Sequence, residues 1–216
     1  QKTAYEIRPR DWSSDVCSSD LAEAQLVGAG AFRLSRLLRG LGGEEHLATR
    51  SLAAGADFVL LDSAVTPLTT SLADIGSGVT WRIGPASLDH ADPAYVEITA
   101  AATAKPLLPF APVHARARRE AAGVRIAFTR RGRREADAWQ TADVPLGEEG
   151  EAYEVEILSG AAVARTLAGV STNMLYASAD EIADFGAPQQ ALTLRVYQKS
   201  LVAGRGFARE ATVAIA

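Results

Sequence analysis

The stretch Gly123–Thr129, GVRIAFT, carries apolar side chains at Val124, Ile126 and Phe128, each separated from the next by one residue. Successive side chains of a β-strand point to opposite faces of the sheet. A period of two therefore predicts a strand with one face on a core and the other in water. Similar patterns recur along the second half of the chain. Strands are predicted over residues 113–119, 124–128, 153–157, 172–176, 192–196 and 211–215.

Glycine-containing turns separate these strands. A count of about seven strands over the last 107 residues fits an antiparallel β-sandwich. The pattern resembles a fibronectin type III domain. Phe128 would occupy the position of that family's strand-B tryptophan, and Leu192-x-Leu194-x-Val196 would match its strand F. Leu192 also stands where the family has its corner tyrosine, so the resemblance implies the two-layer architecture with two departures from the family pattern.

A proline-punctuated stretch containing Pro106, Pro109 and Pro112 precedes the sandwich and indicates a linker or the lead into its first strand. The upstream sequence is less regular, with a helical turn predicted after Glu44. The fold predicted is mainly β: a β-rich segment over residues 22–108, which would be the C-terminal part of a larger domain, followed by the sandwich over residues 109–216. Strands of the upstream segment are predicted at residues 57–62, 79–83 and 95–99.

The first 21 residues look foreign to the chain. Reverse translation of residues 11–21 (DWSSDVCSSDL) matches a short-read sequencing adapter, and residues 1–7 (QKTAYEI) resemble the outer arm of the same adapter. Segments of this origin are excluded from fold reasoning. We therefore expect residues 1–21 to be non-native, the natural N-terminus to be missing, and this segment to pack against nothing.

The remaining 195 residues carry 19 basic and 22 acidic side chains, and the single cysteine, Cys17, lies outside them. This mild net charge argues against a protein that binds nucleic acid over its whole surface. Without cysteine, disulfides, thiolate zinc sites and cysteine nucleophiles are excluded. No apolar run reaches the length of about 18 residues that a spanning helix needs, so no membrane span is predicted.

Motifs that would support catalysis or cofactor binding are missing from the sequence. His46, His90 and His114 are isolated from one another, which argues against a metal site. No nucleophile elbow, Walker loop or dinucleotide fingerprint occurs. We predict no catalytic residue, no cofactor and no metal, and expect His114 on the outward face of its strand.

Acidic side chains cluster at residues 44–45, 148–151 and 180–184. A glycosidase needs two carboxyl groups placed across a sugar, one of them with a raised pKa. The clusters fall in predicted turns and helix surfaces, so we expect them to be solvated. In the third cluster, Ser178 precedes Glu181 by three residues, which predicts a short helix capped by Ser178.

Eight arginines fall within nineteen residues, between Arg116 and Arg134. The simplest interpretation is the solvent face of two neighbouring strands, whose charge blocks edge aggregation. A second is contact with an anionic surface, such as lipopolysaccharide or teichoic acid, or with a neighbouring subunit; DNA is a third, weakened by the scarcity of aromatics. Trp139 either stacks on a sugar or protein or turns inward to the core. The candidate interaction residues are Arg116, Arg118, Arg125, Arg130, Arg131, Arg133, Arg134 and Trp139.

Several short sequence segments, taken in their order along the chain, resemble the C-terminal part of a phage tail-tip protein. This is a baseplate hub or host-specificity protein of the type found in gene transfer agents. No single segment is diagnostic, and the order carries the resemblance. The segments are AFRLSRLLRGLGGEEH (31–46), FVLLD (58–62), WRIGPA (81–86), PVHARARR (112–119), DVPLGEEGEAYEVEIL (143–158) and RVYQKSLVAGRGF (195–207).

The resemblance implies a structural and interaction role, assembling the hub and contacting the host surface. It implies other tail-tip proteins as partners, a homo-trimer in the full-length form, contact with a host cell-surface glycan, no nucleic acid, and a location in the virion tail tip after assembly in the bacterial cytoplasm. Family members often carry a glycoside-hydrolase-like TIM barrel upstream, and this sequence contains none of it, so we predict no enzyme. The alternative is an accessory carbohydrate-binding module of a cell-wall glycoside hydrolase.

Overall fold

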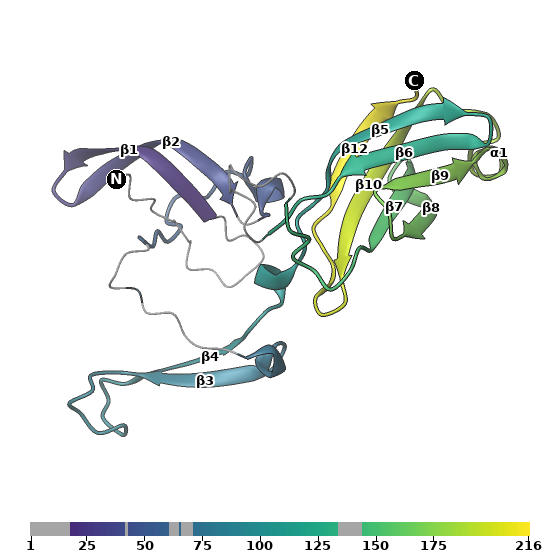
Figure 1. Ribbon diagram of the computed structural model, residues 1–216. Coiled ribbons are helices and arrows are strands. Elements are labelled where there is room, and N and C mark those ends of the chain that lie inside the picture. Colours follow the sequence, from purple (N-terminus) through teal and green to yellow (C-terminus); the bar gives the residue numbers. More distant parts are fainter. Residues whose placement is uncertain (1–17, 42, 61–64, 66–70, 134–143) are drawn as a thin grey trace. The chain divides into compact units, whose positions relative to one another are not determined.

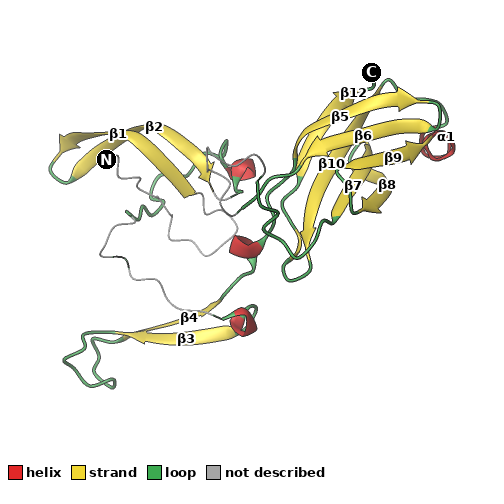
Figure 2. Cartoon of the chain, viewed as in Figure 1, coloured by secondary structure: helices red, strands yellow, loops and turns green. Residues whose placement is uncertain are grey.

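A computed structural model describes residues 18–41, 43–60, 65, 71–133 and 144–216. The chain divides into two compact units. The larger comprises Gln1–Asp62 and Leu108–Ala216, and the smaller is Ser63–Leu107. Strands are the most abundant regular structure among the described residues of both units and every sheet is antiparallel, which confirms the predicted mainly β fold (Figures 1 and 2).

The last hundred residues of the larger unit form a sandwich of two antiparallel sheets, as the sequence predicts. One sheet has the order β5-β6-β9, and in the other β10 lies beside β7, which pairs with β8. The free side of β10 pairs with β12 along most of its length and with β11 near its end. The bounds are β5 (Val113–Glu120), β6 (Gly123–Thr129), β7 (Tyr153–Ser159), β8 (Ala162–Gly169), β9 (Asn173–Ala177), β10 (Ala191–Ser200), β11 (Gly204–Arg205) and β12 (Arg209–Ala214).

The core of the sandwich is built from the alternate residues that the strand pattern predicts. Val124 and Ile126 of one sheet, and Leu194 of the other, have no exposed surface. Phe128 meets Tyr153 of the opposite sheet edge-on, with 5.3 Å between ring centroids, and so joins the two layers. Each such side chain contributes about 1.5–3 kcal/mol through burial, which makes this core the main source of stability in the larger unit.

A short helix, α1 (Ser178–Phe185), links β9 to β10. The helix was predicted, but the prediction that Ser178 caps it is wrong by one residue, because Ala177 occupies the cap position and makes no side-chain hydrogen bond to the helix. Glu181 does not complete a capping box, because its carboxylate is taken by Arg119 and the backbone N–H of Gln189.

A hairpin of β1 (Ser18–Gly28) and β2 (Ala31–Leu41) begins the described part of the larger unit. Residues 1–17 of the adapter-like segment lie outside the described residues. Its last four residues, 18–21, pair with the end of β2, so the expectation that the whole segment packs against nothing is wrong for them. The physical reason is that ladder hydrogen bonds join main-chain groups, which any non-proline sequence supplies.

A 3-10 helix, Glu45–Leu47, follows the hairpin and buries Leu47, in agreement with the predicted helical turn. The strand predicted at 57–62 is wrong in its described part. Residues 57–59 form no strand, and the Phe58 side chain is about half exposed. Leu60 forms only an isolated β-bridge, and the Phe58 and Leu60 side chains remain exposed.

The smaller unit contains one hairpin, β3 (Gly78–Ile83) and β4 (Val96–Ala101), close to the predicted strands. Two 3-10 helices, Leu72–Asp74 and Lys105–Leu107, lie before and after it. The change between units falls between Leu107 and Leu108, inside the proline-punctuated stretch. Across the described residues of both units, none of the helices has the length and apolar character needed to cross a membrane.

Candidate functional site

The arginine cluster divides into groups with different surroundings. Arg116 and Arg118 lie on β5 with exposed side chains, and Arg125 lies directly opposite Arg118 on β6. Strand alternation places all three on the outer face of the β5-β6-β9 sheet, since the intervening Ala117 and Ile126 are buried. We call these three residues the arginine face. Arg125 pairs with Glu120 at 3.1 Å, whereas Arg116 and Arg118 have no ion pair among the described residues.

The juxtaposition within the arginine face has an energetic consequence. Like charges directly opposite one another on neighbouring strands destabilise a sheet by a few tenths of a kcal/mol to about 1 kcal/mol. Arg118 and Arg125 form such a pair, and Glu120 compensates only one of them. An uncompensated group of guanidinium ions on a regular sheet face is a surface that attracts anions.

Two other members of the cluster stabilise the loop that leads into β7. Arg133 pairs with the buried carboxylate of Glu148 at 2.7 Å. Arg130 donates to the backbone oxygen of Val144 at 2.7 Å and approaches Glu151. Their charges are therefore compensated within the fold. Arg134 and Trp139 lie outside the described residues, so their predicted roles stay predictions.

Arg131 joins the sandwich to the turn that follows β2. Its guanidinium contacts Glu45 at 2.5 Å and lies over the Phe110 ring, 5.1 Å from the centroid. Gly43 has a φ of 92°, and a Cβ there would lie 2.6 Å from a Phe110 ring atom. His46 packs on Phe207 with 5.3 Å between ring centroids. We call residues 43–47, which make these contacts with the sandwich, the clasp.

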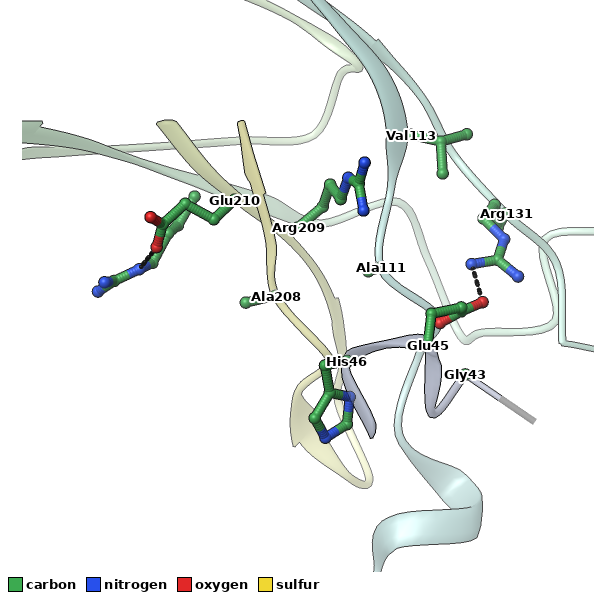
Figure 3. A pocket seen from close by; sticks show the side chains of 10 residues that line it. Gly43, Glu45, His46, Ala111, Val113, Arg131, Ala208, Arg209 and Glu210 are labelled. Carbon is green, nitrogen blue, oxygen red and sulfur yellow. Dashed lines mark hydrogen bonds and ion pairs between the residues drawn. The ribbon is translucent and has the colours of Figure 1, made fainter. Parts of the chain in front are cut away.

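A cavity of about 280 Å³ opens beside the clasp, at the end of the sandwich where β12 begins (Figure 3). Small apolar residues, Ala111, Val113 and Ala208, form part of its wall. Two guanidinium groups, those of Arg131 and Arg209, are drawn toward the space above Ala111. Arg209 is not among the candidate residues predicted from the sequence, because it lies far from the arginine cluster along the chain.

Two of the acidic side chains expected to be solvated, Glu148 and Glu181, are instead buried in ion pairs, whereas Glu149 and Glu151 are exposed as expected. Glu181 and Glu148 are almost fully buried, each with about 1% of its side chain exposed. The hydrogen bond from Arg119 lowers the pKa of Glu181, and the hydrogen bond from Arg165 lowers the pKa of Asp184. A catalytic acid requires the opposite shift, so these carboxyl groups are structural.

The ion pairs continue on the outer face of the second sheet. Glu154 accepts a hydrogen bond from Lys199 and forms an ion pair with Arg205, and both partners lower its pKa. Arg205 also lies over the Tyr197 ring, 4.4 Å from the centroid. Within the described ranges, no group of three or more His, Cys, Asp or Glu side chains is arranged to hold a metal ion. His114 is exposed, as expected, and its φ of 55° marks an irregularity in β5 that the sequence did not predict.

Comparison with known proteins gives a match to a family model and a likeness to solved structures. The family model described as "Rcc01698-like, C-terminal" matches residues 20–59, under a fifth of the chain. A crystal structure of domains d3–d4 of the rat CD45 extracellular region is similar over 89% of this chain and 93% of its own, with 8% sequence identity and a TM-score of 0.36. No curated protein matches.

Proposed function

We propose that this chain is a structural and interaction component of a phage or gene-transfer-agent tail tip, where it helps to assemble the baseplate hub and contacts the host surface. The ordered segments of the sequence support this proposal, and so does the family match over residues 20–59, the stretch that forms the β1–β2 hairpin and the clasp. In this proposal the chain acts by presenting surfaces and carries out no catalysis of its own.

The observation that carries the proposal is the exposed apolar face of the hairpin. Leu26 and Phe32 are directly opposite one another, and Leu38 follows on the same face by alternation along β2. Their exposed fractions are 63%, 61% and 61%. The other face is mixed, because Ser35 donates to Glu23 at 2.9 Å there and Leu37, which is 45% exposed, lies opposite Leu21. A two-stranded hairpin is marginally stable alone, and an exposed apolar face of this kind marks a protein interface. A neighbouring tail-tip protein would cover it.

The arginine face supplies the second contact in this proposal. Its charges lie on the regular outer surface of a sheet, with no aromatic side chain opposite Arg118 or Arg125 on β5 and β6. Such a surface attracts the phosphates and carboxylates of a bacterial envelope by long-range electrostatics, and its contribution falls as salt rises. This arrangement fits contact with an anionic host surface better than recognition of nucleic-acid bases, which needs stacking.

Co-expression with the neighbouring genes tests the assembly role. We expect the chain to copurify with a tail-tip protein encoded beside it, and the double substitution Phe32→Asp/Leu38→Asp to abolish copurification. Val170→Asp is the control, because Val170 is even more exposed, at 76%, but lies in the sandwich, between β8 and β9. The proposal fails if the neighbouring genes encode no tail protein, or if Val170→Asp reduces copurification as much as the double variant does. It also fails if the purified chain hydrolyses peptidoglycan reproducibly.

A further inference from the structure

Arg209 occupies an unusual position for a charged side chain. In the β10–β12 register it lies directly opposite Val196, and the next residues on the same face of β12 lie opposite Leu194 and Leu192. All three β10 residues are buried in the core. By strand alternation Arg209 therefore lies on the inner side of β12, where the strand pattern calls for an apolar residue, but its side chain is exposed at the end of the sandwich beside the cavity.

The charge of Arg209 is not compensated within the described part of the chain. The other charged side chains of the cavity already form pairs: Arg131 with Glu45 at 2.5 Å, and Arg195 with Glu210 at 2.7 Å. Arg209 makes no ion pair or hydrogen bond with any described residue. The cavity thus holds three guanidinium groups and two carboxylates, which leaves one positive charge in excess.

The geometry of the cavity sets the size and chemistry of a ligand. Figure 3 shows the Arg209 side chain extending from β12 toward the side on which Arg131 lies, above the small side chain of Ala111. A planar guanidinium binds carboxylate and phosphate oxygens through two parallel hydrogen bonds. A volume of about 280 Å³ lies at the lower limit for a small-molecule site, so the space suits one anionic group and a few atoms attached to it.

We propose that this cavity is an anion-binding site in which Arg209, assisted by Arg131, binds a single carboxylate or phosphate group of a small ligand. The arginine face is a separate surface on the outer side of a sheet, and the site does not depend on the proposed role in a tail tip. Glu45 orients the Arg131 guanidinium through its ion pair and, by its negative charge, keeps the cavity from accepting a second anion.

Titration of the full chain with inorganic phosphate and with acetate, at constant ionic strength, tests the site. Isothermal calorimetry should show saturable binding of at least one anion with one site per chain. Tighter binding of phosphate would indicate phosphoryl ligands, and equal or tighter binding of acetate would indicate carboxylates. In Arg209→Gln the affinity should fall at least about tenfold, because a charge-assisted hydrogen bond is lost.

Arg116→Gln is the matched control, since it removes an equally unpaired arginine from the arginine face and should leave the affinity unchanged. The fold of each variant is checked by its urea midpoint, which both substitutions at exposed positions should preserve. The proposal is overturned if neither anion binds saturably, if Arg209→Gln binds as well as the parent chain, or if Arg116→Gln weakens binding to the same degree.

Discussion

At the scale of single residues, the carboxylate of Glu181 connects three segments of the sandwich. Both of its oxygens accept from the Arg119 guanidinium at the end of β5, and the backbone N–H of Gln189 donates to it at 2.8 Å. Arg119 in turn donates to the backbone oxygen of Gln189. These bonds fix α1 and the approach to β10, the region in which a corner tyrosine would act and where this chain has Leu192.

Replacing this carboxylate should weaken the sandwich. Glu181→Gln leaves Arg119 without its counter-ion, and we expect a loss of about 2 kcal/mol in the free energy of unfolding, less than for a fully buried pair because Arg119 is partly exposed. Urea denaturation measures the change. Asp180→Asn, which disrupts an exposed pair on the same helix, should cost under about 1 kcal/mol. Equal losses would contradict the special role of Glu181.

The same pair predicts a pH dependence. The Arg119 hydrogen bond and the Gln189 N–H hold the pKa of Glu181 below its ordinary value of 4.5 in the folded chain. The stability that this group contributes is therefore complete above the ordinary pKa and is lost as the pH falls through the lowered one. The unfolding free energy of Glu181→Gln should decline less steeply below pH 4.5 than that of the parent chain; parallel curves would contradict the assignment.

Gln198 is a polar side chain in an apolar environment. It is fully buried, and neither its side-chain oxygen nor its nitrogen has a hydrogen-bond partner among the described residues. Since a buried polar group without a partner costs about 1–3 kcal/mol, Gln198→Met should raise the free energy of unfolding by about 1 kcal/mol in urea. Gln190→Met, at an exposed position, should change little. A destabilised Gln198→Met variant would show that the amide is hydrogen-bonded in the native state.

At the scale of elements, the sequence predicted the strands that must bury one face. β6, β7 and β10 lie between two neighbours, and their inward residues reveal the period of two. The prediction missed β8, an edge strand whose Val163 is 45% exposed, because an edge strand with little burial imposes little alternation. The Arg119–Glu181 pair and the cavity could not be predicted, since they bring together chain segments that lie 62 residues or more apart in the sequence.

The clasp is the element whose geometry depends on one glycine. Gly43 and Gly55 both have a positive φ, but only at Gly43 would a Cβ collide with a neighbour, the Phe110 ring. Gly43→Ala should therefore detach residues 43–47 and speed amide hydrogen exchange at Leu47, whereas Gly55→Ala carries the same backbone strain, about 1–2 kcal/mol, without the collision. Mass-spectrometric hydrogen exchange separates the two effects. Unchanged exchange at Leu47 in Gly43→Ala would mean that the clasp tolerates the collision.

At the scale of the whole molecule, stability is distributed unevenly between the two units. The fully buried side chains all belong to the larger unit, and no described residue of the smaller unit is buried. The β3–β4 hairpin is held by its ladder and by cross-strand contacts such as the Thr80–Thr99 hydroxyl pair at 2.8 Å. Local opening requires the least free energy where few apolar contacts are lost. The free energy of opening the smaller unit should therefore be well below the free energy of global unfolding.

Hydrogen exchange of the full chain in increasing urea tests this uneven distribution. The amides of β3 and β4 should exchange through local openings whose free energy is low and hardly depends on urea. Those of β6, β7 and β10 should exchange only through global unfolding. Glu181→Gln provides an internal control, because it should lower the protection of β6 and leave that of β3 unchanged. If β3 were protected as strongly as β6, the hairpin would have to be covered by a partner, such as a second copy of the chain, and dilution would then remove that protection.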